Sequence, residues 1–165
     1  MPTNMYLKIE GPNIDGESTD TKHKNQIEVL SWSHEFSQSI SPTRSSAGGG
    51  TVERARHTDL SFTKYTDTAT ADLLKNCWRG QHFDKMTLSC YRDGGSSPVE
   101  YLNVVMEHVV ISRVKIGGGS GDIPVENISL SYGKVTYKYD PQDEKKGTAG
   151  GAKPASHDLA TNTVA

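Results

Sequence analysis

Two stretches of this chain decide the fold, Ile27–Phe36, which is IEVLSWSHEF, and Leu60–Tyr65, which is LSFTKY. In the first, bulky side chains alternate with small polar or acidic ones. Because successive side chains of a strand point to opposite faces, this period predicts one long strand from Gln26 to about Ser39. The face predicted to meet a core holds Leu30, Trp32, His34 and Phe36. The face predicted to meet water holds Glu28, Ser33 and Glu35, with Ser31 placed there loosely.

Similar patterns continue on both sides of these stretches. They predict strands at Met5–Glu10, Met86–Arg92, Val99–Ile116 and 128–139, separated by glycine-rich turns. Val99–Ile116 is apolar on both faces, which favours a central strand or a bulge midway. The apolar phase changes again at Gly133, where we expect a bulge. The fold class is therefore mainly β, a closed or nearly closed two-sheet β-barrel or sandwich.

One short α-helix is predicted after the LSFTKY strand. Thr68 or Thr70 can cap it, and Asp72 suits its first turn. Helical spacing gives the helix an apolar face of Leu73, Leu74, Cys77 and Trp78. Gly80 is placed to end it in the left-handed conformation. About ten residues do not hold a helix alone in water, so we expect it to pack on the sheet.

Two segments have the composition of loops. Ser41–Gly50, SPTRSSAGGG, is predicted to be a mobile loop. Residues 141–165 are rich in Gly, Ala, Thr, Lys and Asn, and their only sizeable aliphatic side chains are Leu159 and Val164. Such a segment buries too little apolar surface to offset ordering. We therefore predict a β-barrel domain over residues 1–140 and a flexible C-terminal tail over residues 141–165.

Composition and charge exclude several classes of protein. The chain has 165 residues, a formal net charge of −2 and a pI of about 6.3, which argue against nucleic acid or an anionic membrane as partner. The N-terminal residues lack the pattern of a signal peptide, and no apolar run is long enough for a membrane helix. We therefore expect synthesis in the cytoplasm, and any secretion by a route other than general export.

Residues with catalytic or metal-binding chemistry form no recognised motif. The six histidines make no HExxH pair or Cys/His cluster with zinc spacing, and His34 and His108 fall on mostly apolar strand faces, where a hydrogen-bonded core histidine is the commoner case. Cys77 and Cys90 are interpreted as small core residues, with a disulfide or a reactive thiol as the alternatives. No nucleophile elbow or phosphate loop is present. We predict no enzyme activity, no cofactor and no metal.

Four motifs in series carry a family resemblance. They are Gly16-Glu17-Ser18 with Asp20 and His23, then VLSWS, then LSFTKY, then PVEYL from Pro98, within roughly residues 5–140. This series resembles the hemolysin-coregulated protein family, whose members form the inner tube of bacterial type VI secretion machines. The resemblance implies a hexameric ring of β-barrel subunits, stacked into a tube that carries effectors and is secreted without a signal peptide. The partners it implies are further copies of the chain, the spike protein, the contractile sheath and effector cargo.

The resemblance also implies roles for particular residues. In the family the serine of the LSWS segment faces the lumen and influences cargo retention, and here it is Ser33. Glu28 and Glu35 would share its polar wall. The family carries an extended loop involved in ring stacking, to which we assign Arg44, Glu53, Arg54 and Arg56. An exposed strand edge remains the alternative for these charged residues.

A different class of function stays open on the sequence alone. A stand-alone β-sandwich binding module, for example one that binds carbohydrate, would display aromatic side chains on an exposed face. Trp32 and Trp78 occupy positions typical of a core. Only Tyr132, Tyr137 and Tyr139 are grouped so that they could form such a platform.

Overall fold

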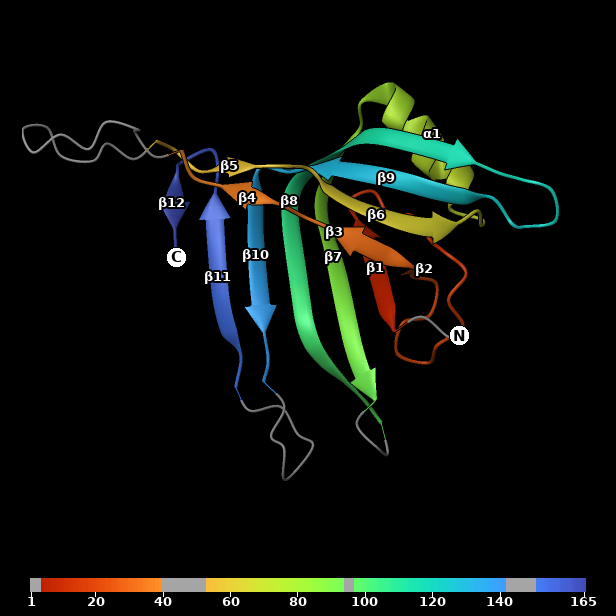
Figure 1. The fold of residues 1–165 in the computed structure, drawn as a ribbon, viewed down its shortest axis with the longest axis horizontal. Coiled ribbons are helices and arrows are strands. Elements are labelled where there is room, and N and C mark those ends of the chain that lie inside the picture. Colours follow the sequence, from red (N-terminus) through yellow and green to blue (C-terminus); the bar gives the residue numbers. More distant parts are fainter. Residues whose placement is uncertain (1–3, 40–52, 94–96, 142–150) are drawn as a thin grey trace, which may run out of the picture.

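The computed structural model describes residues 4–39, 53–93, 97–141 and 151–165, and within them it is built mainly of β-strands (Figure 1). The strands are β1 Met5–Glu10, β2 Ile27–Glu28, β3 Ser31–Ser33, β4 Phe36–Ser37, β5 Arg56–His57, β6 Leu60–Tyr65, β7 His82–Asp93, β8 Pro98–Gly117, β9 Val125–Ser131, β10 Lys134–Tyr139, β11 Lys153–Asp158 and β12 Thr163–Val164. One helix, α1 Thr70–Arg79, lies in the described residues.

The main sheet curves until it closes into a barrel. β1, β7, β8, β9, β6 and β3 pair in that order, and β2 pairs with the free side of β1. Two backbone bonds close the circle, because Val29 N–H donates to Met5 O at 3.0 Å and Leu30 N–H donates to Thr63 O at 2.8 Å. The predicted mainly β barrel with one short helix is confirmed. β10, β11 and β12 extend the sheet beyond the barrel from β8 (Figure 1).

β8 is the central strand that the sequence predicts. It pairs with β7 on one side, and on the other side with β10 through residues 102–107 and with β9 through residues 110–117. The change of partner coincides with a positive φ of 55° at His108 and with a register shift between Ile111 and Arg113. Gly133 lies opposite, between β9 and β10, and donates its N–H to Glu107 O at 3.0 Å. The predicted phase change at Gly133 is therefore the point where the barrel wall and its extension separate.

The single long strand predicted from Gln26 to Ser39 is wrong. The segment is divided into β2, β3 and β4, and the buried phase shifts from Ile27 and Val29 to even positions after Leu30. The shift occurs because the chain changes its neighbour between two successive residues: Val29 is still bonded to β1, whereas Leu30 is bonded to β6. Phe36, predicted to face the core, is 47% exposed because β4 lies outside the barrel.

The helix ends as predicted but presents a narrower buried face. Gly80 adopts the left-handed conformation (φ 65°), and its N–H donates to Cys77 O at 3.2 Å. Neither Thr68 nor Thr70 caps the N-terminus, where Ala69 is the capping position. Leu73 is fully buried, whereas Trp78 is 76% exposed, so its predicted core position is wrong. None of the helices in the described ranges has the length and apolar character needed to span a membrane.

Part of the predicted flexible tail is ordered structure. β11 pairs antiparallel with β10 along its whole length, from Lys134 opposite Asp158 to Tyr139 opposite Lys153. Its backbone hydrogen bonds, together with the burial of His157 and the packing of Leu159 on the core, hold a segment that is poor in apolar residues. The prediction of flexibility is therefore wrong for β11. Residues 142–150 lie outside the described residues.

A charged network is buried beneath the barrel wall. Lys64 and Glu126 are both fully buried, and Lys64 Nζ lies 2.6 Å from Glu126 Oε2 and 2.8 Å from Asp67 Oδ1. Lys64 Nζ also donates to Tyr65 O at 2.9 Å. Asp67 in turn accepts the N–H of Ala69 at 2.9 Å, next to the first turn of α1. The network thus fastens the start of the helix to β6 and β9.

Candidate functional site

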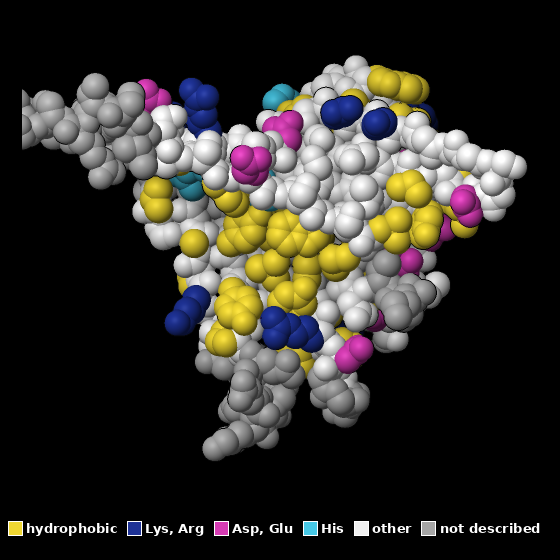
Figure 2. Space-filling view, in the orientation of Figure 1, with side chains coloured by type: hydrophobic (Ala, Val, Ile, Leu, Met, Phe, Trp, Pro, Cys, Tyr) yellow, Lys and Arg dark blue, Asp and Glu magenta, His cyan; other side chains and the backbone are white. Residues whose placement is uncertain are grey.

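One face of the barrel is covered with small polar side chains over β3, β6 and β9. Residues of these strands lie directly opposite one another in two rows, Ser31–Thr63–Asn127 and Ser33–Ser61–Ser129. We call these six residues the polar wall. Figure 2 shows this face as a broad area without hydrophobic or charged side chains, bordered by a hydrophobic area below it.

Hydroxyl groups within the polar wall satisfy one another. Ser31 Oγ lies 2.6 Å from Thr63 Oγ1, and Ser61 Oγ lies 2.9 Å from Ser129 Oγ. Because these hydroxyls pair across strands, the wall stays smooth and offers few unpaired groups to a passing molecule. Ser33 is exposed at its edge. The opposite faces of the same strands hold Leu60, Phe62, Ile128 and Leu130 in the core.

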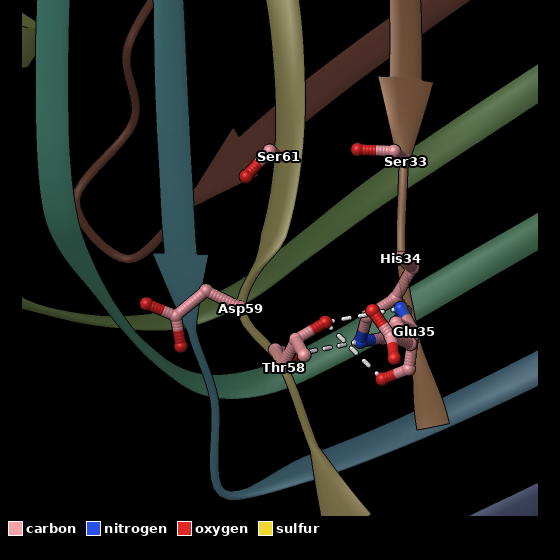
Figure 3. Close-up of a pocket in the computed structure, with 6 residues that line it drawn as sticks. All are labelled: Ser33, His34, Glu35, Thr58, Asp59 and Ser61. Atoms are coloured by element: carbon pink, nitrogen blue, oxygen red, sulfur yellow. Dashed lines mark hydrogen bonds between the residues drawn. The ribbon is translucent and has the colours of Figure 1, made fainter. Parts of the chain in front are cut away.

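A shallow hollow lies where the polar wall meets the loop between β3 and β4 (Figure 3). Its lining residues are Ser33, His34, Glu35, Thr58, Asp59 and Ser61. Thr58 holds the rim, since its hydroxyl donates to Glu35 O at 3.1 Å and accepts from Glu35 N–H at 3.0 Å. Asp59 Oδ2 accepts a hydrogen bond from Ser112 at 2.6 Å. The hollow is polar, open and acidic.

Of the three residues that the sequence predicts to face the lumen, two share this hollow and the third does not. Ser33, Glu35 and Glu28 are all exposed, as the sequence predicts. Glu28, however, lines a separate hollow with Glu17, Leu30, Tyr65, Thr66, Asp67 and Ile123. The separation follows from the change of phase between Val29 and Leu30. The structure therefore does not bring Glu28 together with Ser33.

The predicted stacking residues lie on a projection, the arm, which we define as residues 34–39 and 53–58. β4 and β5 pair with each other in a two-stranded sheet of their own (Figure 1). Glu53, Arg54 and Arg56 are exposed on it. Arg44 lies outside the described residues. The arm therefore presents charged side chains to solvent.

A cluster of histidine and tyrosine side chains lies at the base of the arm. His34 Nδ1 lies 2.6 Å from the Tyr137 hydroxyl, and His34 Nε2 lies 2.7 Å from the Tyr132 hydroxyl. His57 Nδ1 lies 2.7 Å from the same Tyr132 hydroxyl, and His57 Nε2 lies 2.7 Å from His157 Nδ1. The hydrogen-bonded His34 predicted from the sequence is confirmed. His108 is exposed, so its predicted core position is wrong.

Burial controls protonation within this cluster. Burial is the main reason that the pKa of His34 is lowered to about 4. The pKa of His57 is lowered by burial first, and then by the nearby charges of His157 and Arg54. Burial also raises the pKa of the Tyr137 hydroxyl to about 12. His34, His57 and the Tyr137 hydroxyl are thus favoured in their neutral forms near pH 7.

Cysteines and groups of metal-binding side chains are the remaining sources of chemistry among the described residues. Cys90 is buried, and burial raises its thiol pKa to about 11, so it is a poor nucleophile. Cys77 is half-buried on α1, and both thiols are free of disulfides. Among the residues that the structure describes, no group of three or more His, Cys, Asp or Glu side chains could hold a metal ion.

Comparisons with known proteins agree with one another. The model of the family described as "Type VI secretion system effector, Hcp" matches residues 6–139. The curated protein hcp1 of Pseudomonas aeruginosa is 36% identical over 166 residues, which cover 100% of each chain. A solved "type six secretion system protein" is 32% identical, with a TM-score of 0.89 and 99% of each chain covered. The crystal structure of Hcp1 from Salmonella typhimurium is 31% identical, with a TM-score of 0.77 and 100% of each chain covered.

Proposed function

Since this chain belongs to the Hcp family and is a type VI secretion tube protein, we propose that six copies close into a ring, that the rings stack, and that effectors travel within the stack. A ring needs a contact between unlike surfaces that closes by rotation, and a tube needs a second contact that repeats without closing. The further partners are the spike protein at the tip, the contractile sheath outside and effector cargo inside. The chain leaves the cell with this machine.

The polar wall is the observation that supports a bore. A channel that passes folded or partly folded cargo must not bind it tightly, and contiguous apolar surface would do so. The wall of paired hydroxyls meets that need, because it presents hydrated polar groups and no contiguous apolar surface among its six residues. In this proposal Ser33 and Glu35 face the lumen at the hollow. Glu28 contributes from its own hollow farther along the barrel.

The arm is the proposed contact between rings. Glu53, Arg54 and Arg56 are exposed on an element that projects from the barrel, so they can reach a neighbouring ring. Charges in such a contact fix register and orientation more than they add affinity. A contact of this kind lets rings assemble on a partner and separate after delivery. Arg44 belongs to the same proposed contact.

The carbohydrate-binding alternative loses its binding surface in this structure. Tyr132 is buried, and its hydroxyl is engaged by His34 and His57. Tyr137 is half-buried against His34, which leaves Tyr139 as the exposed member of the tyrosine group. Trp78 is exposed on the helix, as a single aromatic side chain. An aromatic platform is therefore not assembled from the residues that could have formed it.

The native mass of the purified protein tests the ring. We expect light scattering on a sizing column to give about six times the 18.0 kDa of the chain. Electron micrographs of the same peak should show annular particles with a central hole. A monomer at high protein concentration would contradict the proposal.

Replacing Ser33 by arginine should impair cargo retention and spare the ring. Ser33 is exposed at the edge of the polar wall, so a long cation there would project into the proposed bore without disturbing the core. We expect the amount of effector that co-purifies with rings from the producing bacterium, measured by quantitative mass spectrometry, to fall about tenfold, which is about 1.4 kcal/mol of binding. The native mass should stay unchanged.

The matched control is Ser120→Arg, which adds the same side chain at an exposed position of the loop between β8 and β9. It should leave cargo retention as in the unchanged protein. If Ser33→Arg abolished rings, or if both variants lost cargo equally, Ser33 would not face the lumen.

A further inference from the structure

The side chains that attach the arm to the rest of the molecule are those of the histidine cluster and Phe36, whose ring packs on Tyr137. Within the described residues, β4 and β5 pair only with each other, so no strand of the main sheet shares backbone hydrogen bonds with them. His34 and His57, one on each side of the arm, make the side-chain bonds to Tyr132, Tyr137 and His157. Their partners lie on or beside β10 and β11. The state of these two rings therefore controls how the arm is held.

The side chains of the cluster form a chain of hydrogen bonds, and the groups at the two ends of this chain fix the direction of every bond within it. Asn162 Oδ1 can only accept, so the proton of His157 is on Nε2, 3.0 Å away. The bare Nδ1 of a neutral His157 then accepts from His57 Nε2–H. At the other end, the carbonyl oxygen of Thr58 can only accept, so His34 carries its proton on Nε2, 3.1 Å away.

The two tyrosine hydroxyls complete the chain in the same sense. Tyr132 donates to the bare Nδ1 of His57 and accepts from His34 Nε2–H. Tyr137 donates to the bare Nδ1 of His34. Each ring then carries one proton, and the single Nε2–H of His34 is shared between the Tyr132 hydroxyl and Thr58 O. The folded arrangement is thus the arrangement of three neutral histidines.

A second proton on both His57 and His157 cannot be accommodated. Their facing nitrogens are 2.7 Å apart, and a bond of this kind needs one donor and one acceptor. If both rings were imidazolium, each nitrogen would carry a hydrogen, and two positive charges would face each other in a partly buried place. His157 is 8% exposed, so water screens this repulsion poorly.

Charged groups of the surrounding elements are of both signs. The arm contributes Arg54 and Arg56, and its Glu35 lies on the rim of the hollow. Asp59 follows the arm, and its negative charge acts on His34 from across the hollow that both residues line. On β11, Asp158 follows His157 and pairs in register with Lys134 of β10. Arg54 lowers the pKa of His57, whereas Asp59 acts in the opposite direction on the pKa of His34.

We propose that the contact between His57 and His157 is an acid-sensitive clasp, which holds the arm on β11 when the rings are neutral and releases it when both are protonated. The proton balance supports this direction. A histidine whose pKa is lowered in the closed form binds more protons when the arm is released. Closure is therefore fully stable above the ordinary histidine pKa of about 6.5 and weakens as the pH falls below it.

Hydrogen exchange of the full-length protein in its native assembly tests the clasp. We expect protection factors of the backbone amides in residues 34–37, 56–58 and 153–158 to fall about tenfold between about pH 7.5 and pH 5. Amides of β1, which the strands β7 and β8 separate from β10, should keep their protection. Nitrogen NMR of the histidine rings at the higher pH should show neutral His157 and His57 with their protons on Nε2.

Two variants remove one titrating ring each and keep a bonding atom in place. His157→Asn retains an acceptor near Nδ1, and His57→Gln retains a donor near Nε2. Either change should reduce the pH response and leave only the part that His34 contributes, while His82→Gln, at an exposed histidine of β7, should preserve the full response. Equal protection of the arm at both pH values in the unchanged protein would overturn the clasp. A full pH response in both variants, or charged rings in the NMR spectrum at the higher pH, would overturn it as well.

The clasp does not depend on the tube function, because its test measures the arm itself. Its consequence for assembly rests on the proposed stacking role of Glu53, Arg54 and Arg56. If that role holds, native mass measurements should show stacked rings separating into single rings over the same pH interval. Exchange that responds to acid without any change in stacking would support the clasp and contradict the stacking role.

Discussion

Replacing Lys64 by methionine should lower the free energy of unfolding by about 3–5 kcal/mol, because it leaves a buried carboxylate without its cation. Lys64 and Glu126 are both fully buried and lie 2.6 Å apart. Methionine fills much of the lysine volume, so the loss would come from charge and not from a cavity. Urea unfolding at fixed protein concentration measures the effect, since the stability of an oligomer depends on concentration.

A matched control and a rescue variant isolate the cause. Lys8 pairs with Glu10 at 3.3 Å on the surface, where its side chain is 55% exposed. Lys8→Met should therefore change stability by no more than about 0.5 kcal/mol. The double variant Lys64→Met/Glu126→Leu removes both buried charges and should recover about half of the loss or more. A double variant less stable than Lys64→Met alone would contradict the electrostatic explanation.

The buried lysine was within reach of the sequence. Leu60, Phe62 and Lys64 share one phase of the LSFTKY strand, so a core face that holds the first two must also hold the third. The two-residue period of the strand alone thus predicts that the Lys64 side chain points into the core. Its partner was out of reach, because Glu126 is 62 residues away and becomes a neighbour only when β6 pairs with β9.

Strand periods predicted the barrel well where a strand keeps the same buried face along its length, as Met5–Glu10 does. The central position of β8 was found because the strand has neighbours on both sides, although it changes partner midway. The segment from Gln26 to Ser39 failed for the opposite reason, since it passes from β1 to β6 and then out into the arm. Trp78 failed because helical spacing cannot tell which edge of an apolar stripe meets the sheet.

The C-terminal strand and the histidine cluster show a different limit. β11 has few apolar side chains, so composition indicated a tail, whereas its order comes from backbone pairing with β10. His57 and His157 are 100 residues apart, and no local pattern relates them. The positions of Ser33 and Glu35 were predictable as exposed, but the hollow that they share is formed with Thr58 and Asp59 from another segment.

Gly16→Ala should cost about 1–3 kcal/mol of stability, because the backbone leaves no room for a methyl group. A Cβ at Gly16 would lie 2.5 Å from Gln26 O and 2.8 Å from Ile27 Cα. Backbone hydrogen bonds hold this contact closed, since Gly16 N–H donates to Asn25 O at 2.7 Å and Ser18 N–H donates to Gln26 O at 3.1 Å. The motif Gly16-Glu17-Ser18 therefore needs glycine at its first position, because only glycine lets this backbone approach residues 26 and 27 so closely.

The clash should also have a local signature. Displacing the loop from residues 25–27 would disturb His23, whose Nε2 lies 2.6 Å from the Tyr91 hydroxyl. We expect the NMR signals of His23 to shift in Gly16→Ala, together with the loss of stability in urea. Gly119→Ala is the control, because nothing lies within 4 Å of the added methyl group, and it should change stability by less than about 0.5 kcal/mol. Equal stability of the two variants would mean that the loop yields without cost, and that the glycine of this motif is not required for packing.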